Sequence, residues 1–98
     1  MSGYQTVAAS QTAQVLSSNG SKGTGQKGDE LKRVIVNVAT SATGTVTIID
    51  GSTSIALTSA NIPIGTYEIN LNMFAQTGPW KVTTGAGATV IAIGDFSA

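Results

Sequence analysis

The stretch Thr66-Tyr-Glu-Ile-Asn-Leu-Asn-Met73 alternates apolar and polar side chains without a break. In an extended strand, successive side chains point to opposite faces, so the Tyr, Ile, Leu and Met side chains share one face. The Glu and Asn side chains share the other. This period of two residues predicts a β-strand with one buried and one solvated face, as is typical of antiparallel sheets.

Short segments of similar character lie on both sides of this strand, each bounded by Gly, Pro, Ser or Asp. They cover residues 31–38, 45–49, 54–57, 80–83 and 88–93. Asp50-Gly51 lies between the second and the third and is a strong signal for a hairpin turn. Short strands at regular intervals predict an all-β fold, a small antiparallel β-sandwich that is jelly-roll-like.

Two of these strands give more detailed expectations. In 31–38 we expect Val34, Val36 and Val38 to share one face, with Lys32 beginning their row at the rim of the sheet. In 88–93 apolar residues fall on both faces. That strand is therefore predicted either to be central in the core or to pair with another subunit.

Residues 1–30 are rich in Gln, Ser, Thr and Gly and are only weakly patterned. Residues 4–8 and 13–16 are predicted as short strands at a sheet edge. Residues 17–28 form a Gly-rich loop that is too long for a hairpin turn, and is either disordered or held by a partner. We therefore predict a flexible, extended N-terminal arm over residues 1–30 and a β-sandwich domain over residues 31–98.

The composition excludes several classes of function. The chain has no His, no Cys and a net charge of zero, and only 10% of its residues are charged, against roughly 25% in average globular proteins. It therefore has no disulfide framework, no thiolate metal site and no global field that would attract nucleic acid. The start of the chain lacks a secretory signal, and no apolar run approaches the ~20 residues that span a bilayer, so synthesis in the cytoplasm without membrane association is expected.

Two patterns in the loop region point weakly to ligands. Gly23-Thr-Gly-Gln-Lys-Gly28 fits the spacing of a dinucleotide-binding loop, but it leads into a strand where that site needs a helix. Basic residues cluster around it without stacking aromatics, so nucleic-acid binding is not predicted. Two interpretations of this cluster remain: it is a solvated loop, or it docks onto an acidic protein. Its charged members are Lys22, Lys27, Asp29, Glu30, Lys32 and Arg33.

The remaining candidate residues do not form a catalytic pattern. General acid–base chemistry needs two groups that converge on one bond, and the five carboxylates show no such pairing, so no enzyme activity, cofactor or metal is predicted. Among the aromatic residues, Tyr67 and Trp80 are expected in the core. Phe74 and Phe96 are the better candidates for subunit contacts.

Four motifs carry a resemblance to a known class of protein: Leu-Lys-Arg at 31–33, Thr-Val-Thr-Ile-Ile-Asp-Gly-Ser at 45–52, Gly-Pro-Trp-Lys-Val-Thr-Thr-Gly at 78–85 and Val-Ile-Ala-Ile-Gly-Asp-Phe at 90–96. Over about two-thirds of its length the chain resembles small β-sandwich virion proteins of tailed bacteriophages. The resemblance implies a capsid decoration or cement protein without catalytic residues. It would bind the major capsid protein on the outer head surface as a homotrimer, and so be located in the virion.

The residues expected to make these contacts are Lys22, Lys27, Asp29 and Glu30 in the arm, together with Phe74 and Phe96. An alternative is a tail or fibre module that recognises a host-surface glycan, for which Asn72, Phe74, Trp80 and Lys81 would form the sugar platform. A carbohydrate-binding module is a third reading, but it needs an exposed aromatic strip that the sequence hardly offers.

Overall fold

The computed structural model of the protein describes residues 2–20, 23–40 and 44–98, and these residues contain strands and no α-helix. Every predicted strand is found, and its ends move by at most two residues. The strands are β1 (Ser2–Val7), β2 (Gln14–Val15), β3 (Glu30–Val38), β4 (Thr47–Asp50), β5 (Thr53–Ala56), β6 (Gly65–Phe74), β7 (Trp80–Thr83) and β8 (Ala88–Asp95).

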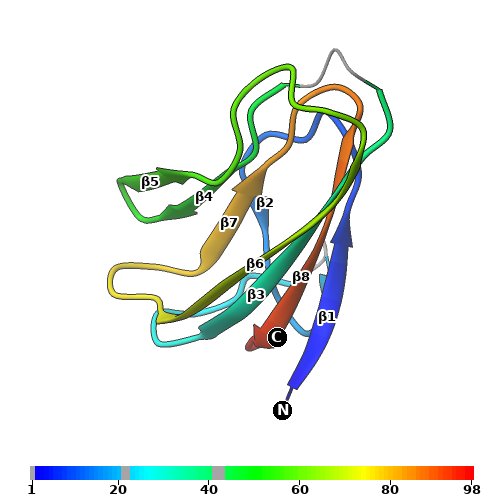
Figure 1. Cartoon of the computed structure of the whole chain (residues 1–98). Helices are drawn as coiled ribbons and strands as arrows, with labels where there is room; N and C mark the ends of the chain where they lie inside the picture. Colours follow the sequence, from blue (N-terminus) through cyan, green and yellow to red (C-terminus); the bar gives the residue numbers. More distant parts are fainter. Residues whose placement is uncertain (1, 21–22, 41–43) are drawn as a thin grey trace.

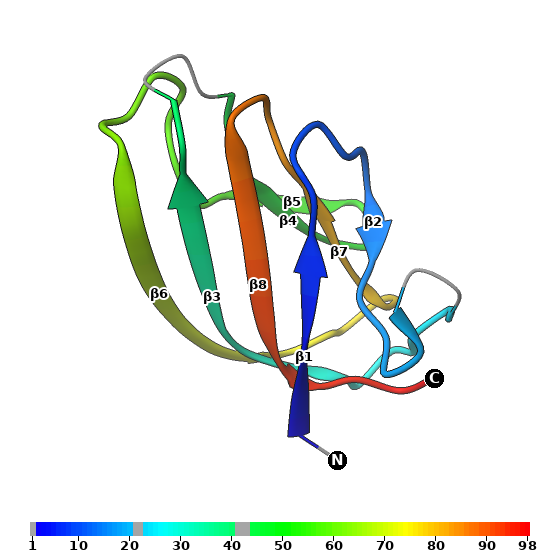
Figure 2. The same ribbon diagram turned by 90° about the vertical axis from the view of Figure 1, so that its right-hand side faces the viewer.

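The strands form two four-stranded antiparallel sheets that pack as a small β-sandwich (Figure 1). Sheet A has the order β1-β8-β3-β6 and sheet B the order β2-β7-β4-β5. Figure 2 shows sheet A with β1 at one edge and β6 at the other. The core lies between the sheets, because alternate side chains of the strands point inward; β5 differs, since all four of its residues are exposed. Its largest fully buried members are Leu16, Leu31, Ile48, Val7, Val34, Val36, Val38, Val46, Val82 and Val90.

Strand β8 lies inside sheet A, between β1 and β3. Val90 and Ala92 face the core, whereas Ile91 and Ile93 are half-buried on the outer face. The central position accounts for apolar residues on both faces, because side chains of two neighbouring strands flank the outer residues.

A β-bulge changes which residue begins the buried row of β3: the sequence predicts Lys32, and the structure has Leu31. Between Leu31 and Arg33 the register shifts against both neighbours, so that Lys32 is an extra residue relative to β8 and faces two residues of β6, Leu71 and Asn72. Asn72 has a φ of 52°, in the left-handed region. Leu31, and not Lys32, therefore begins the buried row, because one extra residue moves a side chain to the other face.

Residues 1–30 were predicted as an extended arm, but their described part contributes one strand to each sheet. β1 pairs with β8 from Ser2 opposite Asp95 to Val7 opposite Val90, and β2 pairs with β7. Both strands lie at sheet edges, where short strands were expected. The Gly-rich segment after them is also packed, since a Cβ on Gly25 would overlap Pro79 and the backbone of Leu16.

Candidate functional site

The predicted contact residues that the structure describes gather at one end of sheet A, the lower end in Figure 1. Glu30 lies directly opposite Phe74 in the pairing of β3 with β6. The N–H of Gly28 donates to the backbone oxygen of Ala75 at 2.8 Å, which places the neighbouring Lys27 beside the end of β6. Lys22 lies outside the described residues.

Two of these residues are buried, which corrects the expectation that they are exposed contacts. The Asp29 carboxylate accepts hydrogen bonds from the N–H of Gln26 (3.0 Å), the N–H of Ser97 (3.0 Å) and the Ser97 hydroxyl (2.7 Å). Phe96 is only 7% exposed, and its ring packs close to Gly94. Both residues hold the end of the chain against the loop before β3, and little of either side chain is exposed in this structure.

Three predicted residues are available at the surface of this end. Lys27 is exposed, Glu30 is half-buried, and Phe74 is 57% exposed. Phe74 lies at an open hollow of about 460 Å³ between the facing ends of β5 and β6. We call it the Phe74 hollow, and it is lined by Asp50, Thr53, Ile55, Met73, Phe74, Gln76, Thr77 and Trp80.

The polar wall of the Phe74 hollow is built around Asp50. Its carboxylate accepts hydrogen bonds from the N–H groups of Gln76 (2.8 Å), Thr77 (3.1 Å) and Gly78 (3.2 Å). Burial raises the pKa of Asp50, but these bonds and the Thr77 side chain lower it by more, so the pKa lies below the ordinary value of 3.8. The charged Asp50 thus fixes the loop that joins Phe74 to Trp80.

The residues proposed as a sugar platform do not form one surface. Trp80 is 2% exposed, and its Nε1 donates to the backbone oxygen of Asp29 at 2.9 Å. Lys81 belongs to β7 in sheet B, whereas Asn72 and Phe74 belong to β6 in sheet A. Trp80 is therefore a core residue, as expected, and it is not available for stacking on a sugar.

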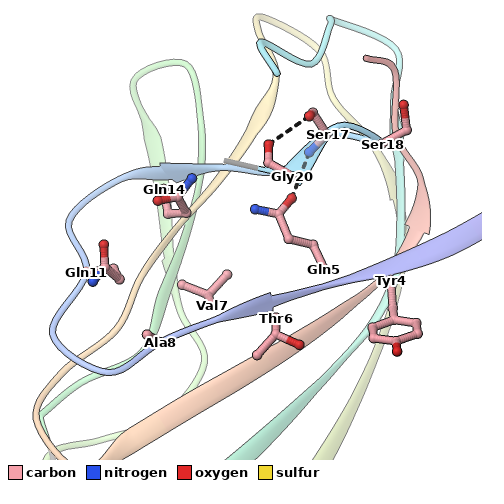
Figure 3. Close-up of a pocket in the computed structure, with 10 residues that line it drawn as sticks. All are labelled: Tyr4, Gln5, Thr6, Val7, Ala8, Gln11, Gln14, Ser17, Ser18 and Gly20. Carbon is pink, nitrogen blue, oxygen red and sulfur yellow. Dashed lines mark hydrogen bonds between the residues drawn. The ribbon is translucent and has the colours of Figure 1, made fainter. Parts of the chain in front are cut away.

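A second hollow of about 530 Å³ lies at the opposite side of the sandwich, between edge strands β1 and β2. Figure 3 shows Gln5 reaching across it, where its Oε1 accepts from the N–H of Ser17 at 2.9 Å. Its Nε2 donates to the backbone oxygen of Val15, also at 2.9 Å. This bridge was not predicted from the sequence. Its one local signal is that Gln5 lies two residues before Val7, on the same inward face of the strand. Uncharged polar groups line this hollow, in contrast to the Phe74 hollow.

Among the described residues, no group of three or more carboxylates could hold a metal ion, and no helix is long and apolar enough to cross a membrane. Comparisons of the chain with protein-family models, curated proteins and solved structures gave no match. The chemistry of the candidate site is therefore read from its own residues: one exposed aromatic ring, an adjoining apolar hollow, and charges of both signs beside them.

Proposed function

We propose that this protein is a non-enzymatic structural protein of a bacteriophage virion that binds the outside of the head as a capsid decoration or cement protein. The observation that carries the proposal is the exposed Phe74 opposite Glu30 and beside Lys27, at the rim of an apolar hollow. Exposed aromatic residues that can enter or line a pocket are typical anchors of protein interfaces. The choice of a phage head rests on the sequence resemblance.

The proposed partner is the major capsid protein. Phe74 and the adjoining Ile55 and Met73 supply apolar area at the centre of the contact, and Lys27 and Glu30 supply charges at its rim. Rim charges of both signs tune association and orientation more than affinity. One such contact is small, so binding as an oligomer would add strength through avidity, and the resemblance implies a homotrimer.

The glycan-binding alternative receives less support from the same residues. It depended on Trp80 as the stacking ring, and that ring is buried and hydrogen-bonded to Asp29. Phe74 alone is too small an aromatic surface for the proposed platform, since Lys81 lies in the other sheet. We therefore keep a single proposed function.

Immunogold electron microscopy of the source particles, with antibody to this chain, tests the location. The proposal expects gold spread over the head. Gold confined to the tail would support the tail or fibre module instead. Particles without gold would contradict the assignment to a virion.

Co-sedimentation of purified protein with particles that lack it tests the contact surface. Phe74→Ser is expected to weaken binding at least tenfold, because an anchoring aromatic residue contributes about 2 kcal/mol or more. Ile64→Ser is the matched control, because Ile64 is 65% exposed and adjoins the opposite end of β6. If Phe74→Ser binds as well as Ile64→Ser, the Phe74 end is not the contact surface.

A further inference from the structure

The edge strands of the two sheets differ in how their unpaired backbone groups are protected. β2 has two residues and β5 has four, so each offers little to a partner strand. β6 carries the charge of Glu68 and the bulge at Asn72. β1 has none of these devices: among the described edge strands it alone combines a length of six residues with an unbroken register and no charge or Pro. Such an edge is a template for pairing with another strand.

Tyr4, in the middle of β1, is 73% exposed. It lies on the outer face of sheet A opposite Ile93, with Thr6 opposite Ile91 as the next pair on that face. An aromatic ring on an edge strand has a neighbouring strand on one side and is open on the other, in agreement with the high exposure of Tyr4. An added strand would cover that second side and place cross-strand side chains against the ring.

The hollow between β1 and β2 follows the edge of β1. A hollow on one face of a sheet would be lined by alternate residues of a strand. This hollow is lined by the consecutive residues 4–8, so it runs along the edge of the strand. Figure 3 shows Gln5 and Val7 on one side of β1 and Tyr4 and Thr6 on the other. The opposite wall is uncharged and includes Gln11 and Gln14. An extended strand alongside β1 would thus meet backbone hydrogen-bonding groups on one side and uncharged amides on its inner face.

We propose that β1 pairs in antiparallel orientation with β1 of a second copy of this chain, which joins two copies of sheet A into one continuous sheet. A second copy fits because Ser2–Val7 carries no charge, so two such edges meet without the repulsion that like charges would cause. The Tyr, Thr and Val side chains of the segment favour strands in both copies. The pairing has two-fold symmetry and gives a dimer, in contrast to the homotrimer implied by the resemblance.

Sedimentation equilibrium of the purified protein tests the pairing without any capsid. The wild type is expected at twice the 9.9 kDa mass of one chain. The variant Tyr4→Lys/Thr6→Lys is expected at the mass of one chain, because charges on both outer positions repel across the pair. The matched control Thr66→Lys/Asn70→Lys places two Lys on the outer face of β6, at the other edge of sheet A, and is expected to remain a dimer.

Charge complementation distinguishes edge pairing from a general effect of charge. An equal mixture of the Lys variant and Tyr4→Glu/Thr6→Glu is expected to recover the mass of two chains. A wild type that sediments as one chain or as a trimer overturns the proposal, as does a dimer that the Lys variant preserves.

A spin label keeps the proposal testable if the charged variants fail to fold. The chain has no Cys, so Thr6→Cys and Thr66→Cys each give one labelling site. Pairing of β1 predicts a clearly shorter distance between the two labels of a dimer at position 6 than at position 66. Equal distances, or a longer one at position 6, overturn it.

Discussion

The indole Nε1 of Trp80 donates a hydrogen bond of 2.9 Å to the backbone oxygen of Asp29, and both residues are buried. The same oxygen accepts from the N–H of Ala75 at 2.9 Å. The Asp29 carboxylate accepts hydrogen bonds from Gln26 and Ser97, so this residue joins the loop before β3, the start of β7, the end of β6 and the residues after β8. This one residue thus organises the end of the molecule at which Phe74 is exposed.

Trp80→Phe is expected to lower the free energy of unfolding by about 1–2 kcal/mol. The phenyl ring keeps most of the core contacts, but the oxygen of Asp29 loses one of its two donors. Trp80→Ala also opens a cavity and is expected to cost about 3–5 kcal/mol. Urea unfolding followed by circular dichroism measures both values. A Phe variant as stable as the wild type would show that the indole hydrogen bond adds nothing.

Asp50 gives the fold a specific acid sensitivity. Its pKa is lowered in the folded protein, so its stabilising effect is complete above the ordinary carboxyl pKa of 3.8 and is lost as the pH falls through the lower folded value. Asp50→Asn is expected to cost about 2 kcal/mol at neutral pH, since hydrogen bonds to a charged acceptor are replaced by neutral ones. It should also flatten the loss of stability below about pH 4.

The control for Asp50 is Glu68→Gln. Glu68 forms an exposed ion pair of 3.0 Å with Arg33, so its removal is expected to change stability by less than about 1 kcal/mol. Unfolding free energies measured across the acid range for both variants check the prediction. Equal curves for Asp50→Asn and the wild type would mean that the loop after β6 is not held by the ionised carboxylate.

Gly94 is expected to be intolerant of any side chain. A Cβ at this position would overlap the backbone oxygen of Glu30 and crowd the ring of Phe96, because Gly94 lies opposite Leu31 in the pairing of β8 with β3. Gly94→Ala should therefore destabilise the fold by about 3 kcal/mol. Gly78→Ala is the matched control, because a Cβ there has no neighbour within 4 Å. Thermal unfolding measures both effects, and equal melting temperatures of the two variants would contradict the prediction.

Gln5 is expected to stabilise the side of the sandwich between β1 and β2. Gln5→Leu leaves the buried N–H of Ser17 without its acceptor and leaves the oxygen of Val15 with only the long contact from Gln14, which should cost about 2 kcal/mol. Gln14→Leu is the control, since Gln14 makes one long contact of 3.4 Å to the same oxygen. Chemical denaturation should rank the Gln5 variant well below the Gln14 variant, and the opposite order would contradict the bridge.

The strands from residue 31 onward were predictable because alternation of apolar and polar side chains is a local property. The β6 stretch shows this best, since each of its residues faces the side that the period of two assigns. The bulge was not predictable, because no local pattern marks the one extra residue at Lys32. On β6 the bulge coincides with Asn72, which has the left-handed conformation. An Asn in the sequence does not identify a bulge, because this residue type is equally common in turns.

The candidate site was predictable only residue by residue. Phe74 interrupts the run of polar residues on the outer side of its strand, and that local feature marked it as a contact residue. Its position opposite Glu30 depends on which strands pair, and the burial of Asp29 and Phe96 depends on contacts with segments distant in sequence. Glycines in residues 23–28 looked like a flexible loop, whereas Gly25 meets Pro79 closely enough to exclude a side chain.

The pairing of β1 with β8 has a consequence for how the chain is made. Residues 2–7 have no partner in sheet A until residues 90–95 have left the ribosome, and β2 likewise waits for β7. Contacts between residues so far apart in sequence also form slowly. The two sheets therefore cannot be completed until β7 and β8 have been made, and until then the nascent chain carries residues 2–7 as an unpaired, uncharged strand.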